Sequence, residues 1–121
     1  AQYEVNKLSA ELGNADVELV RKELGTEFDM IVHEPDGILE IGQAGHSKAS
    51  GIERLCASLG IAKEDTYAFG DSANDVEMLE FVAHGIAMGN GTDVAKNAAE
   101  FITTDIHKDG IWNGLKHYGL I

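Results

Sequence analysis

The 121-residue chain has a single cysteine, Cys56, so it cannot form an intrachain disulfide. Proteins without a disulfide framework are typical of reducing compartments, which predicts a cytoplasmic location. No apolar run approaches the roughly 20 residues that a membrane-spanning helix needs, and no signal-like segment is visible at the N-terminus. These absences argue against a disulfide-rich scaffold and against a helical membrane protein.

Basic residues are also scarce, since nine Lys and Arg stand against 21 Asp and Glu, for a formal charge of −12. No basic face is left over to neutralise a nucleic-acid backbone or an anionic bilayer, so neither is an expected partner. A small phosphate can still be held locally by a metal ion, one lysine and the N–H groups of a helix N-terminus.

Several common ligand-binding motifs are missing. The Gly-Lys-Ser/Thr of a P-loop does not occur, and the loop Gly89–Gly91 fails as a dinucleotide fingerprint because Val94 occupies the third glycine position. The loop after Asp71 fails as an EF-hand, because Val76 stands where glycine is needed. The five histidines show no zinc-ligand spacing.

The second half of the chain alternates between helical and strand patterns. Predicted strands cover 66–69, 85–88 and 101–104, and predicted helices run from Ser47 to near Gly60, after Asp71, after Thr92 and from about Asp109. Ile52, Leu55, Cys56 and Leu59 would form the inward face of the first of these helices. The alternation predicts an α/β fold with a doubly wound parallel sheet.

The first half has a different pattern. It predicts an ambiguous strand within 3–12, a helix from an Asn14 cap to Leu24, and an antiparallel hairpin of strands 28–33 and 37–41. The residues 34–37 between those strands read Glu-Pro-Asp-Gly, which is favourable turn chemistry. A linker is expected at 42–45.

The stretch Thr66–Leu79 carries the residues that indicate chemistry. Its apolar run ends in Gly-Asp, so Asp71 is expected directly after a strand, at the sheet edge where open α/β folds bind ligands. Asp75 follows in the first turn of the next helix, and Asn74 offers an amide donor to a phosphate oxygen. Mg²⁺ prefers one or two carboxylates with water and substrate phosphate. The stretch predicts a magnesium and phosphate site, and the alternative is a set of helix-capping side chains.

Two other positions extend this site. Lys48 stands at the start of the Ser47 helix, where its ammonium and the free N–H groups could hold one anion; the alternative is a solvated surface lysine. The glycine loop Gly89–Thr92 leads into a helix and either approaches a phosphate or only turns the chain.

At these residues the sequence resembles the haloacid dehalogenase (HAD) superfamily, and within it the Cof-type (class IIB) phosphatases with an α/β cap. The resemblance is most specific over Phe69–Leu79, with its Gly-Asp-Ser-Ala-Asn-Asp motif, and over Gly85–Asn90. It implies a Mg²⁺-dependent phosphatase that acts on small phosphorylated metabolites: sugar, nucleotide or cofactor phosphates.

The resemblance also implies roles for individual residues. Asp71 would be a magnesium ligand and Asp75 a supporting acid that binds the metal directly or through water. Lys48 and Asn74 would contact the transferring phosphoryl group, with Asn90 nearby. Ala49 departs from the family pattern, which has glycine after the lysine.

A larger departure is the absence of the family's Asp-x-Asp motif, whose first aspartate forms a phospho-aspartate, from all 121 residues. In the family layout, residues 1–44 would match the C-terminal part of an α/β cap and 45–121 the C-terminal part of the HAD-like core. The chain is therefore expected to be the C-terminal half of a longer protein and inactive alone. The missing central strand would leave the 66–69 strand with a free edge, which predicts self-association or pairing with an N-terminal half.

Two other classes stay open. One is the phosphorylation domain of a cation-transporting P-type ATPase, which shares a similar Gly-Asp-x-x-Asn-Asp stretch and a Gly-Ile-Ala-Met-Gly run. The other is a non-catalytic module that binds phosphate or metal, which the missing nucleophile favours.

Overall fold

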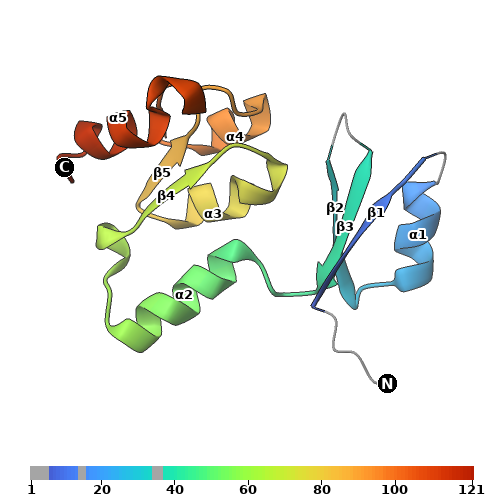
Figure 1. Ribbon diagram of the computed structural model, residues 1–121. Coiled ribbons are helices and arrows are strands. Elements are labelled where there is room, and N and C mark those ends of the chain that lie inside the picture. The colour runs from blue at the N-terminus through green and yellow to red at the C-terminus, as the bar shows by residue number, and fades with distance from the viewer. Residues whose placement is uncertain (1–5, 14–15, 34–36) are drawn as a thin grey trace, which may run out of the picture. The chain divides into compact units, whose positions relative to one another are not determined.

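The computed structural model describes residues 6–13, 16–33 and 37–121 (Figure 1). The chain divides into two compact units, Ala1–His46 and Ser47–Ile121. The assignment of these units to a cap and a core stays a prediction. Within the described residues, no helix has both the length and the apolar character needed to cross a membrane.

The first unit is a three-stranded antiparallel sheet with one helix. Its elements are β1 (Lys7–Glu11), α1 (Val17–Leu24), β2 (Phe28–His33) and β3 (Ile38–Gln43), and the strand order is β1-β3-β2. The predicted hairpin of β2 and β3 is confirmed. Its turn at 34–36 lies outside the described residues. β3 continues through Gly42 and Gln43, so the predicted linker at 42–45 is wrong for these two residues.

The N-cap residue of α1 differs from the predicted Asn14. Asp16 is the N-cap, since its Oδ1 accepts the N–H groups of Glu18 (3.0 Å) and Leu19 (3.4 Å). Asn14, the predicted cap, lies outside the described residues. The helix ends at Gly25, whose φ of 66° is a left-handed value that favours glycine.

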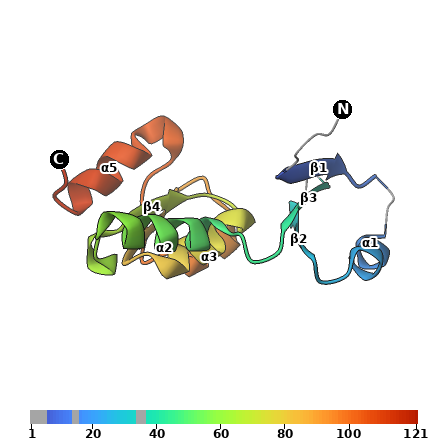
Figure 2. The same ribbon diagram turned by 90° about the horizontal axis from the view of Figure 1, so that it is seen from below.

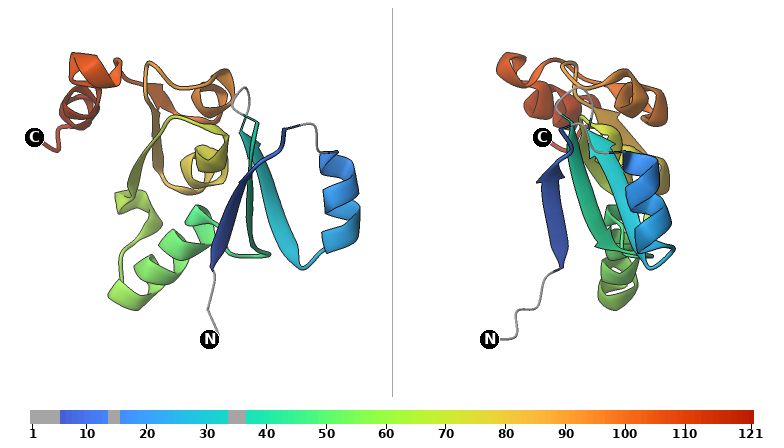
Figure 3. Two further views of the ribbon diagram at one scale, coloured as in Figure 1. Left: turned by 45° about the vertical axis from the view of Figure 1, so that its right-hand side comes forward. Right: turned by 90° about the vertical axis from the view of Figure 1, so that its right-hand side faces the viewer.

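The core of this unit is small. Met30 and Leu39 are buried, and α1 lies along one side of the sheet (Figure 3). The expected half-buried alternation in β1 is wrong, because all five residues of that strand are exposed, Leu8 by 56%. An eight-residue helix covers too little of the sheet to bury its outer strand.

The second unit has the predicted doubly wound parallel architecture. Its sheet has the order β4-β5-β6 and is parallel throughout, with Phe69, Ile86 and Phe101 in register. In Figure 2, α5 lies on one side of this sheet and α2 and α3 lie on the other. The elements are α2 (Lys48–Leu59), β4 (Tyr67–Gly70), α3 (Val76–Phe81), β5 (His84–Ala87), α4 (Asp93–Ala98), β6 (Phe101–Ile102) and α5 (Gly110–His117).

The strand boundaries differ from the predictions by one or two residues. β4 and β5 are each displaced by one residue, and β6 ends at Ile102 instead of residue 104. Thr103 still donates its N–H to Ala87 O, so the chain leaves the sheet gradually. Single 3₁₀ turns cover Lys63–Asp65, Ala73–Asp75 and Ile106–Lys108.

The helix α2 begins and ends where the sequence predicts, but its predicted inward face is partly wrong. Ser47 forms a capping box with Ser50, and Gly60 ends the helix in the left-handed conformation. Leu55 and Leu59 are 56% and 61% exposed. β4 is an edge strand of the described sheet, so no described strand extends under that side of the helix.

The core of the second unit lies at the centre of its sheet. Ile86 and Ala87 of β5 are completely buried, and Leu79 of α3 is 2% exposed. Gly85 allows α3 to approach β5 closely, since a Cβ there would lie 2.3 Å from Leu79 O. This packing holds the carboxyl ends of β4 and β5 side by side.

Candidate functional site

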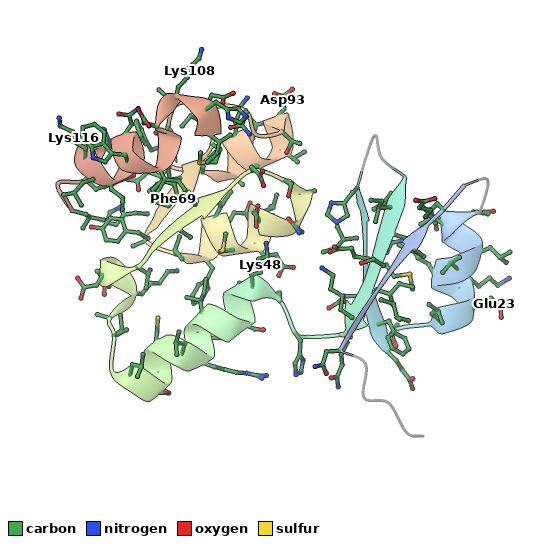
Figure 4. All side chains as sticks on the ribbon, viewed as in Figure 1. Glu23, Lys48, Phe69, Asp93, Lys108 and Lys116 are labelled. Carbon is green, nitrogen blue, oxygen red and sulfur yellow. The ribbon has the colours of Figure 1, made fainter. Side chains whose placement is uncertain are left out.

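Four of the predicted site residues lie in two places: Asp71, Asn74 and Asp75 follow the carboxyl end of β4, and Lys48 begins α2. Gly70 ends β4, Asp71 follows it, and the turn Ala73–Asp75 leads into α3. Lys48 is the first residue of α2, and Figure 4 shows its side chain directed toward α3. The Lys48 ammonium reaches Asp75, with 2.5 Å between Nζ and Oδ1.

Asp75 is a buried carboxylate that accepts hydrogen bonds at both of its oxygens. The residue is 5% exposed. Its Oδ1 binds Lys48, and its Oδ2 accepts the backbone N–H groups of Asp71 (2.9 Å) and Ser72 (3.3 Å). Such charge-assisted hydrogen bonds are stronger than neutral ones. The carboxylate therefore joins the start of α2 to the turn before α3.

The local sequence explains this geometry. Ser72 and Asp75 form a reciprocal capping box, a Ser-x-x-Asp spacing that is visible in the sequence. Gly70 provides the room, because a Cβ there would lie 2.6 Å from Asp75 Cβ. The turn can therefore fold back over the end of β4 only with glycine at that position.

Burial and hydrogen bonding act in opposite directions on the pKa of Asp75. Burial raises the pKa of the carboxyl, but the hydrogen bonds from Lys48 and from the N–H groups of Asp71 and Ser72 outweigh burial. The pKa of Asp75 therefore lies below its ordinary value of 3.8. Asp75 is ionised at neutral pH.

A pH dependence of stability follows from this lowered pKa. Because the folded-state value lies below 3.8, the stabilisation is fully present above 3.8 and is lost as the pH falls through the folded-state pKa. We expect the free energy of unfolding to decrease over that acidic range, and to decrease less steeply in Asp75→Asn. Urea unfolding from about pH 2 to pH 6 measures this; equal slopes for both proteins would contradict it.

Asp71 differs from Asp75 in that its contacts to the described residues are made by its backbone. Its backbone N–H binds Asp75 and its backbone oxygen accepts the N–H of Thr92 (2.8 Å), while the residue itself is exposed. Among the described residues, its carboxylate has no hydrogen-bond or ion-pair partner. A fixed backbone with an unoccupied carboxylate suits a ligand of a hard cation.

The two asparagines are each engaged through the side-chain oxygen. Asn74 Oδ1 accepts the hydroxyl of Ser72 (2.6 Å), and Asn90 Oδ1 accepts the N–H of Ile106 (2.9 Å). No described residue accepts a hydrogen bond from their NH₂ groups, which can therefore act as donors to a ligand. Sequence reasoning missed the contact to Ile106, which joins residues 16 positions apart and has no local signal.

The described residues contain no group of three or more His, Cys, Asp and Glu side chains able to hold a metal ion. A Mg²⁺ ion bound at Asp71 would therefore need water or substrate oxygens as further ligands. That donor set fits Mg²⁺, which usually keeps several waters and takes one or two protein carboxylates.

Comparison with known proteins places the chain in a family. The family model of haloacid dehalogenase-like hydrolases matches residues 2–115, and the chain belongs to this family. An uncharacterised protein from the pdhA 5′ region of Geobacillus stearothermophilus is 53% identical over 78 residues, which cover 64% of this chain and 82% of that protein.

Two further relatives have a described activity. The 5-amino-6-(5-phospho-D-ribitylamino)uracil phosphatase YitU of Bacillus subtilis is 42% identical over 84 residues, covering 69% of this chain and 31% of YitU. The solved structure of BT4131, a sugar phosphatase of HAD subclass IIB, superposes with a TM-score of 0.88 and 30% identity over 98% of this chain and 45% of BT4131. The chain thus spans less than half the length of both phosphatases.

Proposed function

We propose that this chain is part of a Mg²⁺-dependent phosphatase that hydrolyses small phosphorylated metabolites. It would supply the phosphate-binding lysine, Lys48, and the metal-binding carboxylate, Asp71. The observation that carries the proposal is the pairing of Lys48 with buried Asp75, next to the free carboxylate of Asp71. Phosphoryl transfer depends mainly on positioning and charge neutralisation, and this arrangement offers both.

Lys48 has a double role in this proposal. One of its three N–H donors holds Asp75, and the side chain is 50% exposed, so the remaining donors can reach a phosphate oxygen. Asn74 can donate its NH₂ group to the same phosphate, and Asn90 can donate from the neighbouring loop. Asp71 would hold the metal, and Asp75 would act through Lys48 and through the N–H of Asp71. A bound Mg²⁺ would neutralise negative charge on the phosphate oxygens.

The attacking carboxylate has to come from outside these residues. The family mechanism uses a phospho-aspartate, and the 121 residues contain no Asp-x-Asp. Lys48, Asp71 and Asp75 would then position and neutralise the phosphoryl group, without turnover by this chain alone. In this proposal residues 1–44 form the C-terminal part of the cap and 45–121 the C-terminal part of the core.

The edge of β4 is the place for a partner strand. β4 is an edge strand of the described sheet, and exposed Leu55 and Leu59 of α2 add apolar surface. Unpaired edges and apolar surface promote association. We therefore expect the isolated 121-residue chain to self-associate in analytical sedimentation. A stable monomer at all concentrations would contradict this.

The substrate class rests on the relatives. YitU is named for a uracil compound with a phosphorylated ribityl group and BT4131 is a sugar phosphatase, which favours a substrate whose phosphate is carried by a sugar or sugar-alcohol group. The test is a screen of metabolite phosphates against the full-length gene product with and without Mg²⁺. Release of phosphate from none of them would overturn the proposal.

A second candidate is a non-catalytic module that binds phosphate or metal. It is favoured by one observation, the absence of Asp-x-Asp from these residues. The same screen separates the two functions, because a binding module would retain phosphate without hydrolysing any ester.

A further inference from the structure

The loop Gly89–Thr92, between β5 and α4, contacts the backbone of Asp71. Thr92 donates its N–H to Asp71 O at 2.8 Å, and its hydroxyl lies 3.3 Å from the same oxygen. Thr92 occupies the N-cap position of α4, but its side chain makes no capping bond. The hydroxyl thus binds Asp71 instead of the helix that it precedes.

Gly91 brings this loop unusually close to Asp71. A Cβ on Gly91 would lie 3.0 Å from Asp71 O and 3.1 Å from Asp71 Cα. Gly91 is not among the glycines with positive φ, so its backbone conformation is open to other residues. A Cβ would also lie 3.0 Å from Met88 O, so the need for glycine here is one of space against Asp71 and Met88, and not of conformation.

The loop is fixed on its other side by the segment after β6. Asn90 Oδ1 accepts the N–H of Ile106 at 2.9 Å, and the N–H of Gly89 donates to Thr104 O at 3.1 Å. A Cβ on Gly89 would lie 2.7 Å from Asp105 N. The loop is thus held between the backbone of Asp71 and the 103–106 segment.

These contacts fix the main chain of Asp71, while its side chain binds no residue in the described part of the chain. Asp75 binds its N–H, and Thr92 binds its carbonyl oxygen, so the peptide groups on both sides of its Cα are held. The position of the Asp71 Cα and the direction of its Cα–Cβ bond are therefore fixed by two neighbours, Asp75 and the loop. A displacement of about 1 Å in such a group is enough to impair a site.

We propose that Asn90 and Gly91 are positioning residues for the Asp71 carboxylate. Gly91 seats the loop against Asp71, and Asn90 fixes the loop by accepting the N–H of Ile106. The inference rests on the proposed function, since it takes Asp71 as the metal-binding carboxylate. In this inference the Asn90 side-chain oxygen holds the loop, while its NH₂ group is the part proposed to bind phosphate.

The test is the binding of Mn²⁺, a spectroscopic substitute for Mg²⁺, to the 121-residue chain, followed by electron paramagnetic resonance. Gly91→Ala adds a methyl group against Asp71 and Met88 O, and Asn90→Ala removes the hydrogen bond to Ile106 without adding bulk. We expect both variants to bind Mn²⁺ about 10- to 100-fold more weakly, as for other residues that orient metal ligands. Gly51→Ala is the matched control, because a Cβ on Gly51 meets no atom within 4 Å.

The outcomes separate this inference from the proposed function. Asp71→Asn should abolish Mn²⁺ binding; wild-type binding by that variant would overturn the metal role of Asp71 itself. If Asp71→Asn loses Mn²⁺ but Asn90→Ala and Gly91→Ala bind it as wild type does, the positioning role is wrong. Thermal melting identifies a variant that fails to fold, and Asn90→Ala then decides alone. A weaker Mn²⁺ affinity at an unchanged melting temperature supports the inference.

Discussion

Replacing Lys48 with methionine in the full-length gene product is expected to lower kcat about 100- to 1000-fold, the usual cost of removing one donor to a developing anion. Methionine keeps much of the length of lysine but has no charge. The loss has two sources. The phosphoryl group would lack a cation, and Asp75, which is 5% exposed, would keep only its two backbone N–H partners.

Two further variants sharpen this result. Lys22→Met makes the same change on an exposed residue of α1 that is not among the site residues described above, and it should leave kcat unchanged. Lys48→Arg keeps the charge but replaces a compact ammonium with a planar fork, so it should restore activity only in part. Wild-type kcat in Lys48→Met would show that Lys48 does not contact the phosphoryl group.

Replacing Gly70 with alanine is expected to lower the free energy of unfolding of the second unit by about 1–3 kcal/mol or more, the cost of overpacking a filled site. The added Cβ would lie 2.6 Å from Asp75 Cβ and 3.1 Å from Leu79 Cδ1. The Asp75 Cβ is fixed to the backbone and cannot rotate away. Relief therefore requires the turn 73–75 to move, which would also separate Asp75 from Lys48.

Urea unfolding of the 121-residue chain measures the loss, and the matched control is again Gly51→Ala. That substitution lies within α2 in open space and should stabilise the helix by about 0.5–1 kcal/mol, since alanine is the better helix former. Equal stability of Gly70→Ala and the wild type would mean that the turn does not pack over Gly70 as described.

The parts of the fold that local sequence determines were predictable. The Ser47 cap, the end of that helix at Gly60 and the parallel alternation of the second unit all follow from short-range patterns. Leu55 and Leu59 could not be placed, because helical periodicity shows which side of a helix is apolar but not whether anything covers it. The first-strand alternation failed at Leu8 for the same reason.

The candidate site shows the same limit. The spacing of Asp71 and Asp75 predicts two carboxylates at one strand end. It does not predict that Asp75 is buried with both oxygens hydrogen-bonded, while the Asp71 carboxylate has no partner among the described residues. That division depends on Lys48, which is 27 residues away in sequence. The contact of Asn90 with Ile106 depends on how the chain returns after β6, which no local pattern encodes.

The most direct test of the account is Mg²⁺-dependent hydrolysis of p-nitrophenyl phosphate by three proteins: the full-length gene product, its Asp71→Asn variant and the isolated 121-residue chain. We expect turnover that requires Mg²⁺ in the first, a loss of that turnover in the second, and none in the third. Clear Mg²⁺-dependent turnover by the isolated chain, or full activity in Asp71→Asn, would contradict it.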